Sequence, residues 1–240
     1  QAADMDALME IAQKHNLYVI EDNAQGIGAN FTAKDGTKTK IGGIGHVGST
    51  SFFPSKNLGC YGDGGAIFTN DDDLAHTIRG VVNHGMYKRY HHDVVGVNSR
   101  LDSLQAVVLN EKLKLLDFYN ERRKWAAIRY TQLLENHPNI LTPVTSGDCD
   151  SHVYHQYTLR LIDTDRDAVV AHFQELGIQC GVYYPIPLHL QKAYADSRYN
   201  EADFTVTNLL VKEVISLPMH SELDEEQIQH ICKTLLAFLG

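Results

Sequence analysis

Residues 4–22 read DMDALMEIAQKHNLYVIED, and this stretch decides the fold class. Its first part predicts a helix over residues 4–16, because apolar side chains recur at helical spacing along one face. These side chains are Met5, Leu8, Met9 and Ala12. The apolar run at residues 17–20 follows without a break and predicts a buried strand. A helix that leads directly into a buried strand is typical of the middle of an α/β unit.

The predicted sheet has few strands. Two more short strands are predicted before residue 70, at residues 49–53 and 66–69. They lie in or just beyond a glycine-rich stretch at residues 26–65, and such backbone often turns tightly or approaches a ligand. A parallel sheet needs several strand–helix units that cover both of its faces. We therefore expect this sequence to be part of a longer protein.

The pattern changes after residue 70. Acidic residues 71–73 open a predicted helix at residues 71–83, and residues 102–137 predict one long helix or two helices with a break. Beyond Pro138 the predicted strands are residues 153–161, 179–184 and 215–217, and the predicted helices are residues 165–176, 202–214 and 224–239. We predict a partial large α/β domain over residues 1–120 and a small α+β domain over residues 121–240.

The composition argues against several classes of protein. The chain has 240 residues, 43% of them hydrophobic, which favours a globular protein. Its formal net charge is -9 and its Lys and Arg residues are scattered, so we expect no nucleic-acid partner. No apolar run reaches the length of about 18 residues that a membrane span requires, and no signal peptide pattern opens the chain. We expect no membrane partner.

The cysteine pattern favours a reducing compartment. The four cysteines are Cys60, Cys149, Cys180 and Cys232. They are far apart and form no CxxC pair, so their spacing signals neither a zinc site nor a disulfide framework. We predict a cytoplasmic protein without a bound metal.

Two charged residues follow predicted strands. Asp22 stands just past the first strand, where α/β sheets place ligand-binding groups, although it can equally cap a turn. Lys56 follows the strand at residues 49–53, and a lone lysine in a loop is most often solvated. Position alone leaves the function of both side chains open.

The motifs around these residues are more specific. The chain carries EDNAQ at residues 21–25, SFFPSKNLG at residues 51–59 and GDGG at residues 62–65. Further motifs are NHG at residues 83–85, GVNSRLD at 96–102, QA at 105–106, YPIPLH at 184–189 and SLPM at 216–219. In this order they resemble the DegT/StrS family of sugar-nucleotide aminotransferases, which depend on pyridoxal phosphate. The resemblance covers nearly the whole chain and implies the aspartate-aminotransferase-like, type I pyridoxal phosphate fold.

The resemblance also implies a cofactor site with two catalytic residues. The family lysine at Lys56 forms a Schiff base with pyridoxal phosphate, and the aspartate at Asp22 pairs with the pyridine nitrogen. Ser51 matches a serine that contacts the cofactor phosphate. Gln25 matches a glutamine near the ring hydroxyl, and Ala24 belongs to the same cofactor-binding motif. The family uses a preceding segment for further phosphate donors and for an aromatic ring on the pyridine, and we do not find that segment in this sequence.

Partners and substrates follow from the same resemblance. The family asparagine at Asn98 reaches a cofactor phosphate across the subunit interface, which implies a homodimer with shared active sites. His84, Tyr184 and His189 fall in segments that line the sugar site, although many members carry His where this chain has Tyr183. Glutamate is the implied amino donor. A nucleotide-linked keto sugar is the implied acceptor, and the YPIPLH and SLPM motifs favour C3 over C4.

Two other functions remain open. In a related branch of sugar dehydratases His replaces the lysine, so Lys56 argues against that reaction. The other alternative is a regulatory or structural relative without enzymatic activity. Such a relative has no need to retain Asp22, Gln25, Ser51 and Lys56 together.

Three further patterns have structural interpretations. GIGHVG at residues 43–48 matches a dinucleotide-binding pattern, but it precedes a predicted strand instead of opening a helix. His91, His92 and Asp93 are interpreted as a solvated loop, because adjacent histidines point apart and no further ligand motif is in view. The acidic run at residues 71–73 lacks the pattern of a calcium loop and is interpreted as a helix start.

Overall fold

The computed structural model describes residues 1–146 and 151–240, so Cys149 lies outside the described residues. The chain divides into two compact units. The first unit comprises Gln1–Glu121 and Thr145–His155, and the second comprises Arg122–Val144 and Gln156–Gly240. The domain division predicted after residue 120 lies next to the boundary between Glu121 and Arg122, but residues 145–155 return to the first unit.

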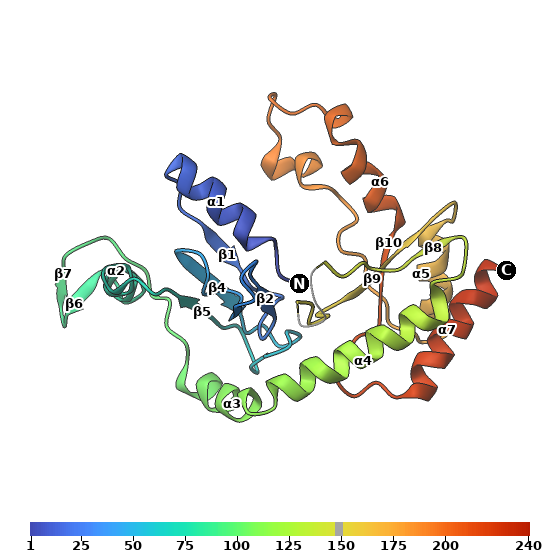
Figure 1. The fold of residues 1–240 in the computed structure, drawn as a ribbon, viewed down its shortest axis with the longest axis horizontal. Coiled ribbons are helices and arrows are strands. Elements are labelled where there is room, and N and C mark those ends of the chain that lie inside the picture. Colours follow the sequence, from blue (N-terminus) through green and yellow to red (C-terminus); the bar gives the residue numbers. More distant parts are fainter. Residues whose placement is uncertain (147–150) are drawn as a thin grey trace. The chain divides into compact units, whose positions relative to one another are not determined.

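The elements follow one another as labelled in Figure 1. The α-helices are α1 (Met5–His15), α2 (Asp72–Val82), α3 (Ser103–Leu113), α4 (Leu116–Leu134), α5 (Arg166–Glu175), α6 (Thr205–Glu213) and α7 (Glu225–Leu239). Short 3-10 helices are η1 (Leu188–Leu190), η2 (Lys192–Tyr194) and η3 (Glu201–Phe204). The strands are β1 (Ile20–Asp22), β2 (Asn30–Thr32), β3 (Lys38–Lys40), β4 (Val47–Ser51), β5 (Gly65–Phe68), β6 (Met86–Lys88), β7 (His91–His92), β8 (Ile140–Leu141), β9 (Tyr157–Leu161) and β10 (Val214–Leu217).

The helix α1 and the strand β1 form the predicted α/β step. The Asp4 carboxylate accepts a hydrogen bond from Ala7 N at 3.1 Å and begins the helix, and Asn16 ends it in the left-handed conformation. The burial predicted for residues 17–20 is wrong, because Tyr18 is 85% exposed and Ile20 is 72% exposed. The strand β1 is an edge of the described sheet, so its apolar side chains lack the cover that a central strand receives.

The main sheet of the first unit has the strand order β1-β4-β5. The strands β1 and β4 are parallel, with Asp22 opposite Ser49, whereas β5 runs antiparallel to β4. A separate hairpin, β2–β3, which the sequence patterns did not predict, follows β1. The parallel pair determines the site, because the carboxyl ends of β1 and β4 meet at one edge of the sheet.

The helix α2 carries an arm, which we define as residues 83–98. The helix begins as predicted, because the Asp71 carboxylate accepts a hydrogen bond from Leu74 N at 2.9 Å. The hairpin β6–β7 in the arm lies beside α2 (Figure 1). Tyr87 stacks on His76 with ring centroids 4.5 Å apart, and a side chain at Gly80 would collide with the tyrosine ring. The arm is therefore packed onto the helix.

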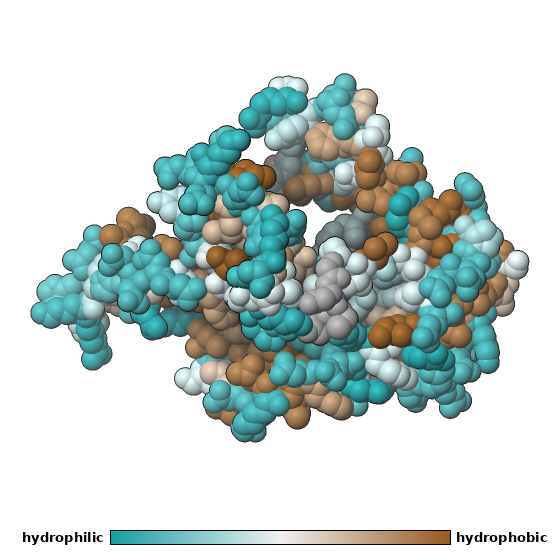
Figure 2. Space-filling model, in the orientation of Figure 1, coloured by the Kyte–Doolittle hydropathy of each residue, from teal (hydrophilic) through white to brown (hydrophobic). Residues whose placement is uncertain are grey.

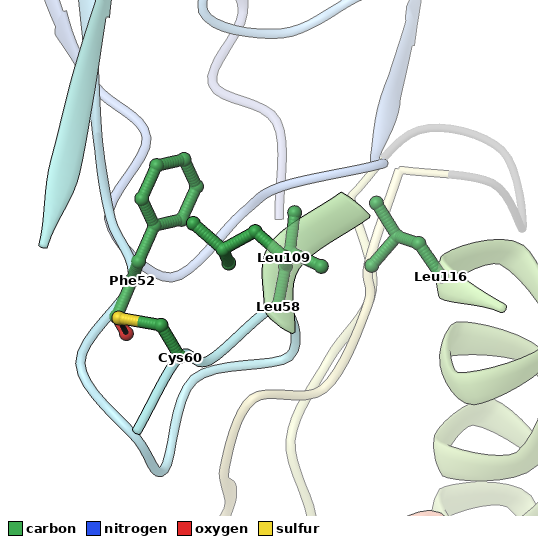
Figure 3. Packing of buried hydrophobic residues seen from close by; sticks show 5 residues of the cluster. All are labelled: Phe52, Leu58, Cys60, Leu109 and Leu116. Atoms are coloured by element: carbon green, nitrogen blue, oxygen red, sulfur yellow. Dashed lines mark hydrogen bonds between the residues drawn. The ribbon is translucent and has the colours of Figure 1, made fainter. Parts of the chain in front are cut away.

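The long helical pattern divides into two helices. The helix α3 ends at Leu113, and α4 begins at Leu116, so the break lies at residues 114–115. Buried side chains from both helices pack against the loop that follows β4 (Figure 3). Leu109 of α3 and Leu116 of α4 pack with the loop side chains Phe52, Leu58 and Cys60. The sequence pattern was compatible with one long helix or with two helices. The structure has two, and both contribute to this packing.

The second unit contains an antiparallel sheet with the order β10-β9-β8. Its core includes Tyr157, Phe173, Ile215 and Leu235, all fully buried. The strand predicted at residues 179–184 is wrong, because only Gly181 pairs, with Ser216, while Tyr183 and Tyr184 are exposed. Among the described residues, no helix combines the length and apolar character needed to cross a bilayer.

Candidate functional site

The end of β1 presents Asp22 in a tight turn. Its Oδ1 accepts a hydrogen bond from Ala24 N at 3.1 Å, and the side chain is exposed. The neighbouring Asn23 is buried and joins this turn to two other segments. Its Nδ2 donates to Ile41 O at 3.1 Å, and its carbonyl oxygen accepts a hydrogen bond from Thr50 Oγ1 at 3.1 Å. Asp22 therefore stands on a fixed backbone.

The carboxylate of Glu21 explains the glycine motif at residues 43–48. Its Oε2 accepts a hydrogen bond from Gly42 N at 2.7 Å, and its Oε1 accepts from Ile44 N at 2.7 Å and Gly45 N at 2.6 Å. Successive backbone N–H groups of this kind form a cradle for an anion. Here the anion is the protein's own carboxylate, which agrees with the rejection of a dinucleotide site.

The end of β4 leads into the loop that carries Lys56. The Ser51 hydroxyl is half-buried and accepts a hydrogen bond from Phe53 N at 3.2 Å. The backbone turns at once, since Lys56 N donates to Phe53 O at 2.9 Å. The Lys56 side chain is half-buried, and its Nζ forms no hydrogen bond or ion pair with residues 1–146 and 151–240. Its amine is available for chemistry.

The helix α3 anchors the rest of this loop. The Gln105 side chain accepts a hydrogen bond from Tyr61 N at 2.8 Å, and Lys112 Nζ donates to Gly59 O. The Cys60 thiol, which is buried, donates to Phe52 O at 3.1 Å. These contacts fix both sides of the turn that carries Lys56.

The adjacent parallel strands β1 and β4 bring predicted cofactor-binding residues of the first unit to one edge of the sheet. The residues Asp22, Ala24 and Gln25 follow β1, and Ser51 and Lys56 lie at the end of the adjacent β4 or just after it. The carboxyl ends of neighbouring parallel strands share one edge, where α/β proteins bind ligands. The arrangement offers a carboxylate, an amide, a hydroxyl and an amine at that edge.

The arm brings His84 and Asn98 together. Asn83 and Asn98 form an isolated bridge, and His84 N donates to Val97 O at 2.9 Å. His92 belongs to the exposed strand β7, so the loop predicted there is wrong, and its Nδ1 lies 2.8 Å from His84 O. Asn98 lines a hollow of about 1050 Å³ beside β5 and α2, with Ser49 and Thr50. Lys56, Asp22, Gln25 and Ser51 do not line this hollow.

Tyr184 and His189 belong to the second unit. Tyr184 is exposed, and His189 lies in η1 with its ring stacked on Phe204 at a centroid distance of 4.1 Å. The His189 Nε2 is buried without a hydrogen-bond partner among the described residues. Over the same residues no group of three or more His, Cys, Asp or Glu side chains could hold a metal ion.

Comparisons with known proteins place this arrangement in a family. Residues 1–236 match the DegT/DnrJ/EryC1/StrS aminotransferase family. The Pleiotropic regulatory protein of Geobacillus stearothermophilus is 45% identical over 240 residues, which cover 99% of this chain and 62% of that protein. The UDP-2-acetamido-2-deoxy-3-oxo-D-glucuronate aminotransferase of Pseudomonas aeruginosa is 45% identical over 235 residues, covering 98% of this chain and 62% of that enzyme.

A solved structure supports the same assignment. The crystal structure of S. venezuelae DesV in complex with a ketimine intermediate superposes with a TM-score of 0.91 at 38% identity. The match covers 99% of this chain and 62% of that one. The fold is therefore the predicted α/β, aspartate-aminotransferase-like, type I pyridoxal phosphate fold. The chain belongs to the DegT/DnrJ/EryC1/StrS aminotransferase family and spans about 62% of the length of the relatives named above.

Proposed function

We propose that the protein is a pyridoxal-phosphate-dependent aminotransferase that moves an amino group from glutamate to the C3 keto group of a nucleotide-linked sugar. Membership of the family supports this reaction, as does the P. aeruginosa relative, whose name specifies a 3-oxo sugar nucleotide. The observation that carries the proposal is the position of Asp22 and Lys56 after adjacent parallel strands. Because the chain spans 62% of that relative, the reaction is proposed for the whole protein.

The side chains present fit the cofactor. Asp22 is an exposed carboxylate that accepts one backbone hydrogen bond at Oδ1, so it retains lone pairs for a protonated ring nitrogen. Lys56 offers an amine that can condense with an aldehyde. The Ser51 hydroxyl can donate to a phosphate oxygen while it accepts from Phe53 N. Gln25 offers an exposed amide to the ring hydroxyl, and Ala24 precedes it in the same turn.

Pyridoxal phosphate, when bound, supplies an electron sink for negative charge on a substrate carbon. Asp22 would strengthen this effect by keeping the pyridine nitrogen protonated. Ser51 would hold the phosphate, together with Asn98 of the partner subunit. Lys56 would anchor the cofactor covalently until the substrate amine replaces it. Its Nζ would then serve as the base that moves a proton from and to the substrate carbon.

His84 in the first unit and Tyr184 and His189 in the second are each proposed to contact the sugar. His84 is held at the base of the arm by the hydrogen bond from its backbone N–H to Val97 O. The buried His189 Nε2, which has no partner among the described residues, would gain one from a sugar hydroxyl. Tyr184 is exposed and has a hydroxyl for the same purpose.

We further propose a homodimer that works in the cytoplasm. On α3, Leu104 is 74% exposed and Val107 is 63% exposed, and Figure 2 shows apolar surface over this helix. Exposed apolar surface of this kind favours a protein interface. The described cysteines Cys60, Cys180 and Cys232 are free thiols, which suits a reducing compartment.

The test of the proposed chemistry uses the absorbance spectrum with added pyridoxal phosphate. We expect the protein to form a visible band that borohydride traps on Lys56 and that glutamate removes. Lys56→Ala should form no such band, because it lacks the condensing amine, whereas Lys14→Ala should behave like the wild type. Lys14 is the matched control because it is exposed on α1. A folded wild-type protein without a band, or with trapping spread over several lysines, would contradict the proposal.

A regulatory protein is the second candidate function. It is favoured by the G. stearothermophilus relative, whose name describes a regulator. The same spectra separate the two candidates, because a regulator without aminotransferase activity would not convert a bound cofactor when glutamate is added. The dehydratase alternative is disfavoured, because Lys56 is present where that branch has histidine.

A further inference from the structure

The side chain next to Lys56 is buried in a network of amides. Asn57 is only 6% exposed. Its Nδ2 donates to Asn120 Oδ1 at 2.8 Å and to Val153 O at 2.9 Å. Asn120 in turn donates from its Nδ2 to Ile27 O at 3.0 Å. The network thus joins the Lys56 loop, the first turns of α4, residue 153 and the turn after β1, all within the first unit.

The far end of this network lies in the turn that carries Gln25. Ile27 and Gly28 belong to the same turn, which begins just after Asp22. A side-chain carbon on Gly28 would lie 2.4 Å from Asn120 Nδ2, and its φ of +90° also favours glycine. The Asn120 amide can approach the backbone closely only because residue 28 has no side chain. The contact between α4 and this turn is therefore specific.

The chemistry of Asn57 points to a role beyond packing. Two acceptors, Asn120 Oδ1 and Val153 O, determine which atom of the amide is the donor. The other atom, Asn57 Oδ1, is buried without a hydrogen-bond partner among the described residues. Burying an unpaired carbonyl costs free energy that an apolar side chain of similar shape would not cost. A contribution to stability therefore does not explain why residue 57 is an asparagine. Its hydrogen bonds, which join two loops, do explain it.

We propose that Asn57 and Asn120 are positioning residues that hold the Lys56 loop and the turn after Asp22 as one rigid body. In the proposed aminotransferase, on which this role rests, the bridge would keep the Lys56 amine and the Asp22 carboxylate at a constant separation. Each loop is also fixed on its own side, by Lys112 and the Cys60 thiol in one case and by Asn23 in the other. The two amides join one loop directly to the other.

The first test needs no cofactor. Hydrogen exchange would be followed at two hydrogen-bonded amides, Lys56 N in one loop and Ala29 N in the other. We expect Asn57→Ala and Asn120→Ala each to speed exchange at both amides by about tenfold, and the double variant to add little. Faster exchange at Lys56 alone in Asn57→Ala, with Ala29 unchanged, would overturn the proposed link.

Two further variants separate positioning from packing. Asn57→Leu keeps a similar shape but has no hydrogen-bond donor, so its exchange rates should match those of Asn57→Ala. It also replaces the alanine variant if that variant fails to fold. Wild-type exchange in Asn57→Leu would show that packing suffices and would overturn the proposal. Thr131→Val is the control, because it removes a side-chain hydrogen bond to Tyr157 in the second unit, where the two oxygens lie 2.8 Å apart.

The second readout is the pH at which the visible band changes in the protein loaded with pyridoxal phosphate. We expect Asn57→Leu to move this midpoint by about one pH unit, since the environment of the Lys56 nitrogen changes, while Thr131→Val leaves it in place. An unchanged midpoint in Asn57→Leu would overturn the positioning role. A wild type that forms no band would refute the proposed function, and the exchange experiment would still decide whether the amides link the loops.

Discussion

Glu21 is the residue whose carboxylate holds the glycine loop, and its replacement tests that role. Glu21→Gln removes one of the two acceptor oxygens and directs an N–H₂ group at backbone donors. We expect the free energy of unfolding to fall by about 1–3 kcal/mol, measured by urea denaturation. The control is Glu10→Gln, a change on the exposed part of α1 that should have little effect. Equal stability of Glu21→Gln and the wild type would mean that the three hydrogen bonds do not hold the loop.

Lys56 and Asp22 differ from Glu21 in how many hydrogen bonds their side chains already make within the protein. The Glu21 carboxylate is occupied by three backbone donors of the protein. The Asp22 carboxylate accepts one backbone hydrogen bond, and the Lys56 amine has no hydrogen-bond or ion-pair partner among the described residues. These two adjacent acidic residues on one strand therefore have different partners, because successive strand residues point to opposite faces of the sheet.

Among the elements, the arm depends on a glycine at its base. Gly85 has φ +73°, and a side-chain carbon there would lie 1.7 Å from Val94 O, across the base of the hairpin. Gly85→Ala should therefore lower the free energy of unfolding by about 2–5 kcal/mol. Gly36→Ala is the control, because Gly36 has φ +86° with open space around it, and we expect a loss of about 1–2 kcal/mol. Equal losses in urea denaturation would show that crowding in the arm is unimportant.

The helices α4 and α7 are joined by an ion pair that predicts a pH dependence. Arg129 donates two hydrogen bonds to Glu225 at 2.9 and 2.6 Å. The hydrogen bonds from Arg129, and then that from Gln229, lower the pKa of Glu225 from 4.5 to about 2. A lowered folded-state pKa stabilises the protein above the unfolded value, and this stabilisation is lost as the pH falls through the folded value.

The matched variant for this pair is Glu225→Gln. Its deficit in stability relative to the wild type should be constant above about pH 5 and should shrink between pH 4.5 and pH 2. Urea denaturation at a series of pH values measures this difference, and salt should weaken it because the pair is partly exposed. A deficit that grows on acidification would reverse the predicted sign.

At the scale of the whole molecule, the proposed homodimer predicts a measurable mass. Sedimentation should give about twice the mass of one polypeptide chain of the protein. Leu104→Lys should weaken association if the apolar face of α3 takes part, whereas Ile11→Lys, at an exposed apolar position on α1, should not. A monomeric wild type at micromolar concentrations would contradict the dimer. Equal loss in both variants would contradict the role of α3.

The sequence by itself determined the features that depend on local periodicity and on motifs. The structure confirmed the helix predicted over residues 4–16, the helix that begins after Asp71 and the α/β class. These features were predictable because helix caps and apolar stripes act within a few residues. The family resemblance was also confirmed over residues 1–236. The roles assigned to Asp22, Lys56 and the other site residues stay predictions, although the strand ends do gather five of them.

Only the tertiary structure decided which side chains meet across long stretches of chain. Asn57 and Asn120 are 63 residues apart, and no pattern in the sequence predicts their hydrogen bond. The burial expected at residues 17–20 failed for the same reason, since an apolar strand is buried only where other elements cover it. Residues 179–184 likewise do not form the predicted strand, since only Gly181 pairs, with Ser216. Periodicity reports what a segment can bury, whereas its neighbours in space decide what it does bury.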